Sequence, residues 1–290
     1  MFESRFLSGL RTRSRTTAFS RLTVEQLESR DCPSTVTLNA QVLEDHQVRL
    51  TGLVTDGGVG VANVQVQFSG AAGGSIVSAA DGSFSYTTSN AELGVAHAVG
   101  YVGGQAVTNT ADANISVTAP SLAASISGVN QNLVTISGHV DDLDADELVV
   151  VFSGIGSAQI TPDENGDFMI TLEASGLGDL EASVVDLWGQ AADPVELEVN
   201  SDAPVISEFA AVNEMFTIWT FRGFVSDESA AGMTVRLGGL PSLDGVTATV
   251  GSDGWWEVTR TLNAGETGTV TAITTDWWGL DSNLAMTSVS

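Results

Sequence analysis

The stretch LTGLVTD at residues 50–56 returns as ISGHVDD at residues 136–142 and as FRGFVSD at residues 221–227. The three occurrences begin 86 and then 85 residues apart. A period of that length is the size of a whole domain and is much longer than the unit of a solenoid repeat. We therefore expect three copies of one domain, each with its own hydrophobic core.

Three further features keep the same order in every copy. A proline opens each copy, a V-x-[FL]-[SG]-G segment follows, and an Asp-Gly or Asn-Gly pair then precedes an aromatic residue. The prolines are Pro33, Pro120 and Pro204, the segments are 66–70, 150–154 and 235–239, and the aromatic residues are Phe84, Phe168 and Trp256. Such glycine turns between alternating residues are typical of two-residue β-hairpins.

Short strands without an intervening helix favour a sandwich of two antiparallel sheets. The sequence thus predicts an all-β fold of three tandem immunoglobulin-like, or fibronectin-III-like, antiparallel β-sandwiches of seven strands each. We expect them at residues 35–118, 119–202 and 203–290, after a short leader at residues 1–34 that is largely disordered or a short helix.

Charge is distributed unevenly along the 290 residues, whose formal net charge is −26. Six of the ten arginines lie in residues 1–31, and from residue 32 onward four Arg stand against 32 Asp and Glu, a net charge of −28. An acidic surface repels phosphate backbones and anionic lipids, which argues against a nucleic-acid or membrane-surface partner. The single cysteine, Cys32, excludes an intramolecular disulfide, and no apolar run is long enough for a transmembrane span.

The leader allows two interpretations. Thr23 could cap a short helix with Gln26 reaching back, and Pro33 would end it. Residues 21–34 also resemble the N-terminal segment of planctomycete surface and extracellular proteins, an Arg-rich stretch followed by L-x-x-E-x-L-E-x-R-x-x-P-S. The matching positions are Leu22, Glu25, Leu27, Glu28, Arg30, Pro33 and Ser34. This resemblance implies a protein that is secreted or held at the cell surface.

The ends of the second and third copies carry a second resemblance. The segments VDLWGQ at 185–190 and TDWWGL at 275–280 are similar to the V-x-D-x-x-G-N endings of bacterial Ig-like domains in surface proteins. The first copy departs from this pattern, with Tyr101 where the aspartate is expected. The resemblance implies a structural or adhesive protein.

No catalytic constellation is evident in the sequence. The three histidines, His46, His97 and His139, occupy unrelated positions in the copies, and the chain has no H-E-x-x-H, G-x-S-x-G or G-x-x-x-x-G-K motif. We therefore expect a protein that is not an enzyme.

The middle copy is the most acidic, with 16 Asp and Glu and no cationic residue between 119 and 202. Carboxylates at alternate loop positions are the oxygen ligands that Ca²⁺ requires, so calcium is the one cofactor the sequence suggests. The simpler interpretation, which we favour here, is a solvated acidic loop that maintains solubility by mutual repulsion. The candidate metal ligands are Asp141, Asp142, Asp144, Asp146, Asp163 and Asp167.

Five of the six tryptophans fall in the third copy. Neighbouring residues in a strand point to opposite faces, so Trp255 and Trp256 cannot share one core. The alignment gives Trp256 the core position of Phe84 and Phe168, which leaves Trp255 outward. Exposed tryptophans stack on sugars or on proteins, so Trp255 and Trp277 are candidate ligand-binding residues. Packing of Trp255 at a junction or against another subunit is the competing interpretation.

The residues together favour a non-enzymatic, secreted or cell-surface protein that acts as a structural or adhesive stalk of Ig-like domains. Its expected partners are a surface polysaccharide or other surface proteins. The alternative function is carbohydrate binding through exposed tryptophans of the third copy.

Overall fold

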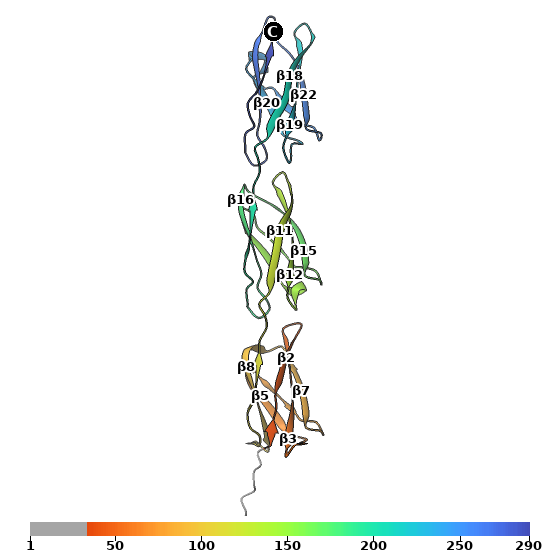
Figure 1. Cartoon of the computed structure of the whole chain (residues 1–290), viewed down its shortest axis with the longest axis vertical. Helices are drawn as coiled ribbons and strands as arrows, with labels where there is room; N and C mark the ends of the chain where they lie inside the picture. Colours follow the sequence, from red (N-terminus) through yellow and green to blue (C-terminus); the bar gives the residue numbers. More distant parts are fainter. Residues whose placement is uncertain (1–33) are drawn as a thin grey trace, which may run out of the picture.

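The computed structural model describes residues 34–290, and the expectations for the leader at residues 1–33 lie outside this range. Alternating apolar and polar residues form three all-β sandwiches, which follow one another end to end along the long axis of the molecule (Figure 1). Each sandwich encloses one cluster of buried apolar side chains. The predicted all-β fold of tandem Ig-like antiparallel sandwiches is confirmed. No helix in this part of the chain has the length and apolar character needed to cross a membrane.

The second and third sandwiches share one topology of three strands against four. In the second, the sheets have the strand orders β11-β12-β15 and β14-β13-β16-β17, and in the third β18-β19-β22 and β21-β20-β23-β24. The strands of the second are β11 (Ser121–Asn130), β12 (Leu133–Asp141), β13 (Val150–Gly154), β14 (Ala158–Ile160), β15 (Asp167–Glu173), β16 (Gly178–Ser183) and β17 (Val195–Val199). Those of the third are β18 (Val205–Met215), β19 (Ile218–Ser226), β20 (Thr234–Gly238), β21 (Thr247–Thr249), β22 (Trp255–Thr261), β23 (Gly268–Thr274) and β24 (Ala285–Val289).

The first sandwich follows the same plan with its strands more divided. One sheet has β2 and β7 on either side of β3, which also pairs with the short β1 and β4, and the other has the order β10-β8-β5-β6 with β9 on β8. These strands are β1 (Thr35–Val36), β2 (Asn39–Leu43), β3 (Gln47–Asp56), β4 (Val59–Gly60), β5 (Gln65–Ala72), β6 (Gly74–Val77), β7 (Ser83–Thr88), β8 (Ala91–Val102), β9 (Gln105–Ala106) and β10 (Ala111–Ile115).

The glycine turns that we expected to form hairpins connect the two sheets instead. Asn165-Gly166, for example, lies between β14 of the four-stranded sheet and β15 of the three-stranded sheet. The turn itself is tight, because Gly166 adopts the left-handed φ of 82° and its N–H donates to the Asp163 carbonyl. An alternating pattern on both sides of a turn looks the same whether the two strands pair in one sheet or lie in opposite sheets. The prediction of hairpins from this pattern was therefore wrong.

Candidate functional sites

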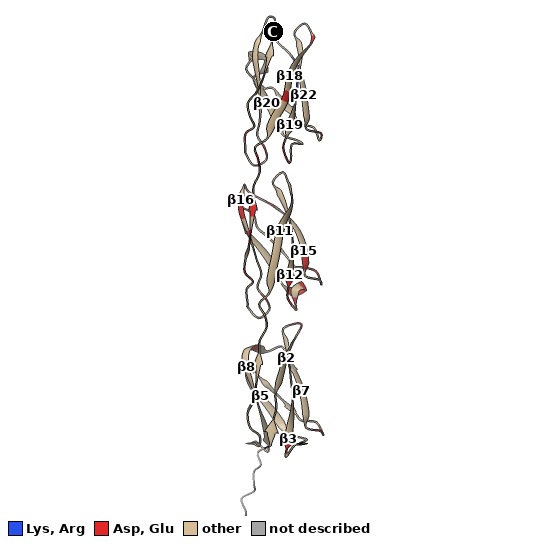
Figure 2. Cartoon of the chain, viewed as in Figure 1, with Lys and Arg blue, Asp and Glu red and all other residues tan. Residues whose placement is uncertain are grey.

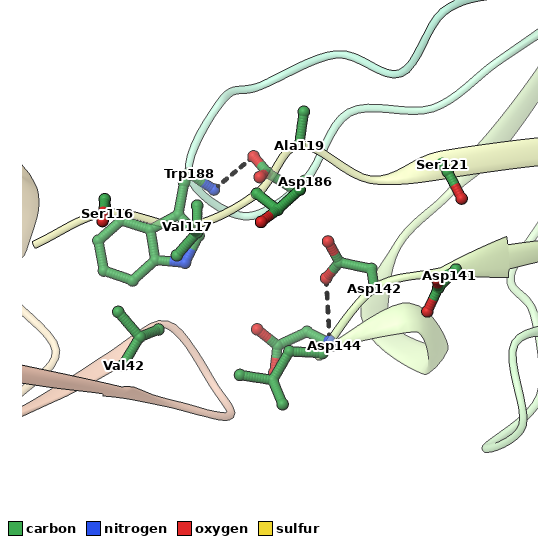
Figure 3. Close-up of a pocket in the computed structure, with 12 residues that line it drawn as sticks. Val42, Ser116, Val117, Ala119, Ser121, Asp141, Asp142, Asp144, Asp186 and Trp188 are labelled. Atoms are coloured by element: carbon green, nitrogen blue, oxygen red, sulfur yellow. Dashed lines mark hydrogen bonds between the residues drawn. The ribbon is translucent and has the colours of Figure 1, made fainter.

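The first candidate site is a cavity of about 550 Å³ between the first and second sandwiches (Figure 3). The β2–β3 hairpin contributes Val42, and the connecting segment contributes residues 116–119. The second sandwich contributes residues 141–144 at the end of β12, together with Asp186 and Trp188 from the loop after β16. The site therefore depends on both sandwiches.

Three contacts hold this junction together. The His46 ring, at the turn between β2 and β3, lies edge-on to the Trp188 ring with 4.1 Å between the ring centroids. The Asp45 N–H donates to Asp144 Oδ1 at 2.8 Å. Trp188 also packs against the buried cluster of the first sandwich, although it belongs to the second. The two sandwiches are thus joined by side-chain packing and hydrogen bonding as well as by the chain.

Carboxylates gather on the second sandwich's side of the cavity (Figure 3). Asp144 and Asp186 are only 5% and 7% exposed. Asp186 Oδ1 accepts the N–H groups of Trp188 at 2.9 Å and Gln190 at 2.7 Å, which fixes its orientation. Burial raises the pKa of Asp142, and the negative charges of Asp186 and Asp144 raise it further, against a lowering by its hydrogen bond from the Asp144 N–H.

The second junction repeats this arrangement with other side chains. The Gln131 N–H, at the turn between β11 and β12, donates to Ser229 Oγ at 2.9 Å. Trp278 of the third sandwich packs against the buried cluster of the second, at the position that Trp188 occupies one copy earlier. Trp277 Nε1 donates to the Ser229 carbonyl at 2.9 Å, which ties the loop after β23 to the loop after β19.

Asp227 and Asp276 are the carboxylates of the second junction. Asp227 Oδ1 accepts the Ser229 N–H, and Asp276 Oδ1 accepts the N–H groups of Trp278 and Leu280. The Oδ2 atoms of both are buried and have no hydrogen-bond partner within residues 34–290. Burial raises the pKa of Asp227, and the charges of Glu228 and Asp276 raise it further. Two buried carboxylate oxygens therefore lie at this junction without a hydrogen-bond donor from the described residues.

The structure separates the six aspartates proposed as metal ligands. Asp141, Asp142 and Asp144 line the junction cavity, whereas Asp146 lies exposed on the short helix η1 (Ala145–Glu147). Asp163 accepts two main-chain N–H groups within the turn before β15, and Asp167 pairs with His139. In the described part of the chain, no group of three or more His, Cys, Asp or Glu side chains is arranged to hold a metal ion.

Asp186, Asp227 and Asp276 were not among the residues predicted from the sequence to bind a metal. The signal was present, because Asp142 and Asp227 end the repeated phrase and Asp186 and Asp276 belong to the repeated V-x-D or T-x-D ending. What the sequence does not show is that these two motifs meet at the same end of the second sandwich and of the third.

The second candidate site is a groove of about 790 Å³ on the third sandwich. It crosses the outer face of the β18-β19-β22 sheet and reaches the segment between β21 and β22. Its lining residues are Glu208, Ala210, Arg222, Thr249, Gly251, Asp253, Trp255, Trp256 and Glu257.

The register of β22 confirms the expected orientation of the two adjacent tryptophans. Trp256 is 2% exposed and packs in the core against Phe209, with 5.5 Å between the ring centroids. Trp255 is 43% exposed and lies edge-on to Phe224, its cross-strand partner, at 5.5 Å. The other candidate, Trp277, contributes to the second junction and does not line the groove.

No family model matches this chain, and no curated protein sequence does. Among solved structures, the chain is similar to the FN1–FN3 domains of chicken CNTN1, with 9% identity over 88% of this chain and 97% of that one and a TM-score of 0.27. It is also similar to the Ca²⁺-stabilized, ice-binding adhesin of an Antarctic bacterium, with 18% identity over 88% and 72% of the two chains and a TM-score of 0.25. Bacterial invasin, an integrin-binding protein, gives 16% identity over 89% and 59% and a TM-score of 0.36. Likenesses of this size carry no argument about function.

Proposed function

We propose that this protein is a non-enzymatic stalk, secreted or at the cell surface, in which tandem Ig-like sandwiches act as a spacer or adhesive element. The observation that carries the proposal is the repeated junction, in which Trp188 and Trp278 each pack on the core of the preceding sandwich. A tryptophan that bridges two sandwiches limits bending between them. Because this packing occurs at both junctions, it supports a stalk of fixed length whose sandwiches keep a fixed direction relative to one another.

Charge supports the same role. Figure 2 shows Asp and Glu toward both ends of the second sandwich, around η1 and the start of β15 on the side of the first sandwich and on β16 on the side of the third. Carboxylates on successive sandwiches repel one another, which opposes folding back of the stalk and keeps the protein soluble. The same charge favours surface proteins or uncharged surface polysaccharides as partners.

A divalent cation, with Ca²⁺ as the best candidate, would complete the junctions. At the first junction Asp142 and Asp186 would be the carboxylates nearest to the ion, since no three carboxylates of the described residues converge there. Asp227 and Asp276, whose Oδ2 atoms lack partners, would serve the second. Calcium takes about six to eight oxygen ligands, so main-chain carbonyls and water would complete the coordination of so few carboxylates. A bound cation would remove the like-charge repulsion and stiffen the connection.

Small-angle X-ray scattering of the full chain tests the stalk. We expect the profile of a rod, with one maximum dimension that does not change between low and moderate salt and a narrower distribution of shapes in millimolar Ca²⁺ than in EDTA. A profile typical of freely jointed or collapsed sandwiches under both conditions would contradict the proposal.

A further inference from the structure

The groove on the third sandwich has a chemical character that the corresponding faces of the other copies lack. Phe224 opposes Trp255 across β19 and β22, and Arg222 opposes Glu257 two pairs further along, on the same face of the sheet. The corresponding pairs in the first sandwich are Leu53–Ser83 and Thr51–Ser85, and in the second they are His139–Asp167 and Ser137–Met169. An aromatic platform beside a guanidinium and a carboxylate therefore occurs on this face of the third sandwich alone.

An irregularity in β18 adds a further polar group to the groove. The pairing of β18 with β19 shifts register between Ser207 and Ala210, and Glu208 adopts a left-handed φ of 51°. Residues other than glycine rarely adopt this conformation, and such bulges commonly redirect side chains beside binding sites. Here the bulge turns Phe209 inward onto Trp256 and leaves Glu208 exposed in the groove.

From these features we propose that the groove binds a neutral or amino-sugar polysaccharide, with Trp255 as the stacking platform. The C–H face of a pyranose ring is apolar and fits an aromatic ring, whereas its hydroxyl groups both donate and accept hydrogen bonds. Arg222 supplies donors, and Glu208, Glu257 and Asp253 supply acceptors. No ion pair of Arg222 occurs within the described residues, so its guanidinium is available to a ligand.

Charge narrows the class of sugar. Three carboxylates stand against one guanidinium in the groove, on a chain that is strongly acidic overall. Uronic-acid and sulfated polysaccharides would be repelled, whereas uncharged glucans, chitin or the ammonium groups of chitosan would not. This inference does not rest on the stalk proposal, because the groove lies within one sandwich.

The test is retention of the full chain on cellulose, chitin and chitosan, with alginate as the acidic comparison. We expect retention on at least one of the first three, no retention on alginate, and binding that Trp255→Ala weakens by at least about tenfold. Trp255→Phe should restore part of the affinity, since it keeps an aromatic face. Phe216→Ala is the matched control, because Phe216 is 89% exposed, lies in the β18–β19 turn and is not part of the groove.

Three results would overturn the proposal: no retention on any of the three polysaccharides, equal retention on alginate, or equal binding by the wild type and Trp255→Ala. Near-ultraviolet circular dichroism and the melting temperature establish that each variant is folded. If Trp255→Ala failed to fold, Arg222→Gln and Glu257→Gln would replace it, with the same expected loss. The scattering experiment does not depend on polysaccharide binding. Failure of the binding proposal can therefore be distinguished from failure of the stalk proposal.

Discussion

Gly138 on β12 lies directly opposite Phe168 on β15, and the Phe168 ring occupies the space into which a side chain at residue 138 would project. The same relationship joins Gly52 to Phe84 and Gly223 to Trp256. The glycine of the repeated phrase and the aromatic residue after the repeated turn are therefore cross-strand partners. In each copy the aromatic ring packs in the space that the glycine leaves open by having no side chain.

Replacing Gly138 by alanine should destabilise the second sandwich. The added Cβ would clash with Phe168 Cζ and with the Ala123 carbonyl, and the ring could move only by disturbing the core. Overpacking of this kind costs about 1–3 kcal/mol, and each kcal/mol corresponds to roughly 4–8 °C in a domain of this size. Differential scanning calorimetry of the full chain measures the loss.

Gly128→Ala is the control for this prediction. It lies on β11 of the same sheet, where the nearest atom to an added Cβ is Thr135 Cβ at an ordinary 3.9 Å. We expect a change within about 0.5 kcal/mol, as for most surface substitutions. Equal losses in the two variants would show that the Gly138–Phe168 contact is not the cause.

The junction depends on Trp188, and Trp188→Ala should loosen it without unfolding either sandwich. The substitution removes the contact with His46 and the packing on the first core, but leaves the Asp45–Asp144 hydrogen bond. We expect a broader distribution of maximum dimensions in solution scattering and faster proteolysis of the connecting segment at residues 116–120. Phe216→Ala, far from this junction, should change neither measurement.

The sequence predicted the repeated domains and their fold, but it predicted few of the contacts between residues that are distant in the sequence. The spacing of Gly52, Gly138 and Gly223 and the alternation around Trp256 were enough for the number of copies, the fold and the buried tryptophan. The groove was predicted only as far as Trp255, because Arg222 and Glu208 reach it through strand register and a bulge that no local pattern announces. Asp163 and Asp186 show the same limit. Asp163 is closer to Asp142 in the sequence but lies outside the junction cavity, whereas the more distant Asp186 lines it.

Asp227 should make the stability of the third sandwich depend on pH in the absence of divalent cations. Burial, Glu228 and Asp276 raise the pKa of Asp227 above its ordinary 3.8, so the folded state favours the protonated acid. This contribution is fully present below pH 3.8 and is lost as the pH rises through the raised pKa. In EDTA, Asp227→Asn should therefore melt at a higher temperature than the wild type near neutral pH, and the difference should shrink on acidification. Parallel melting curves across this range would contradict the role of Asp227.

Calcium should reverse the order of the two melting temperatures. This reversal would distinguish a cation site from a pair of acids that only repel each other. If Asp227 and Asp276 hold Ca²⁺, the wild type gains stability by mass action, about 2.7 kcal/mol at a concentration one hundred times the dissociation constant, whereas Asp227→Asn and Asp276→Asn gain much less. The wild type should then melt above Asp227→Asn in millimolar Ca²⁺ and below it in EDTA. Asp163→Asn should keep the full calcium response, because Asp163 does not line the cavity at the first junction and its Oδ1 is held by two main-chain N–H groups. If the melting temperature of the wild type does not respond to Ca²⁺, the proposed cation at the junctions is contradicted. Packing of Trp188 and Trp278 would then be the main connection between the sandwiches.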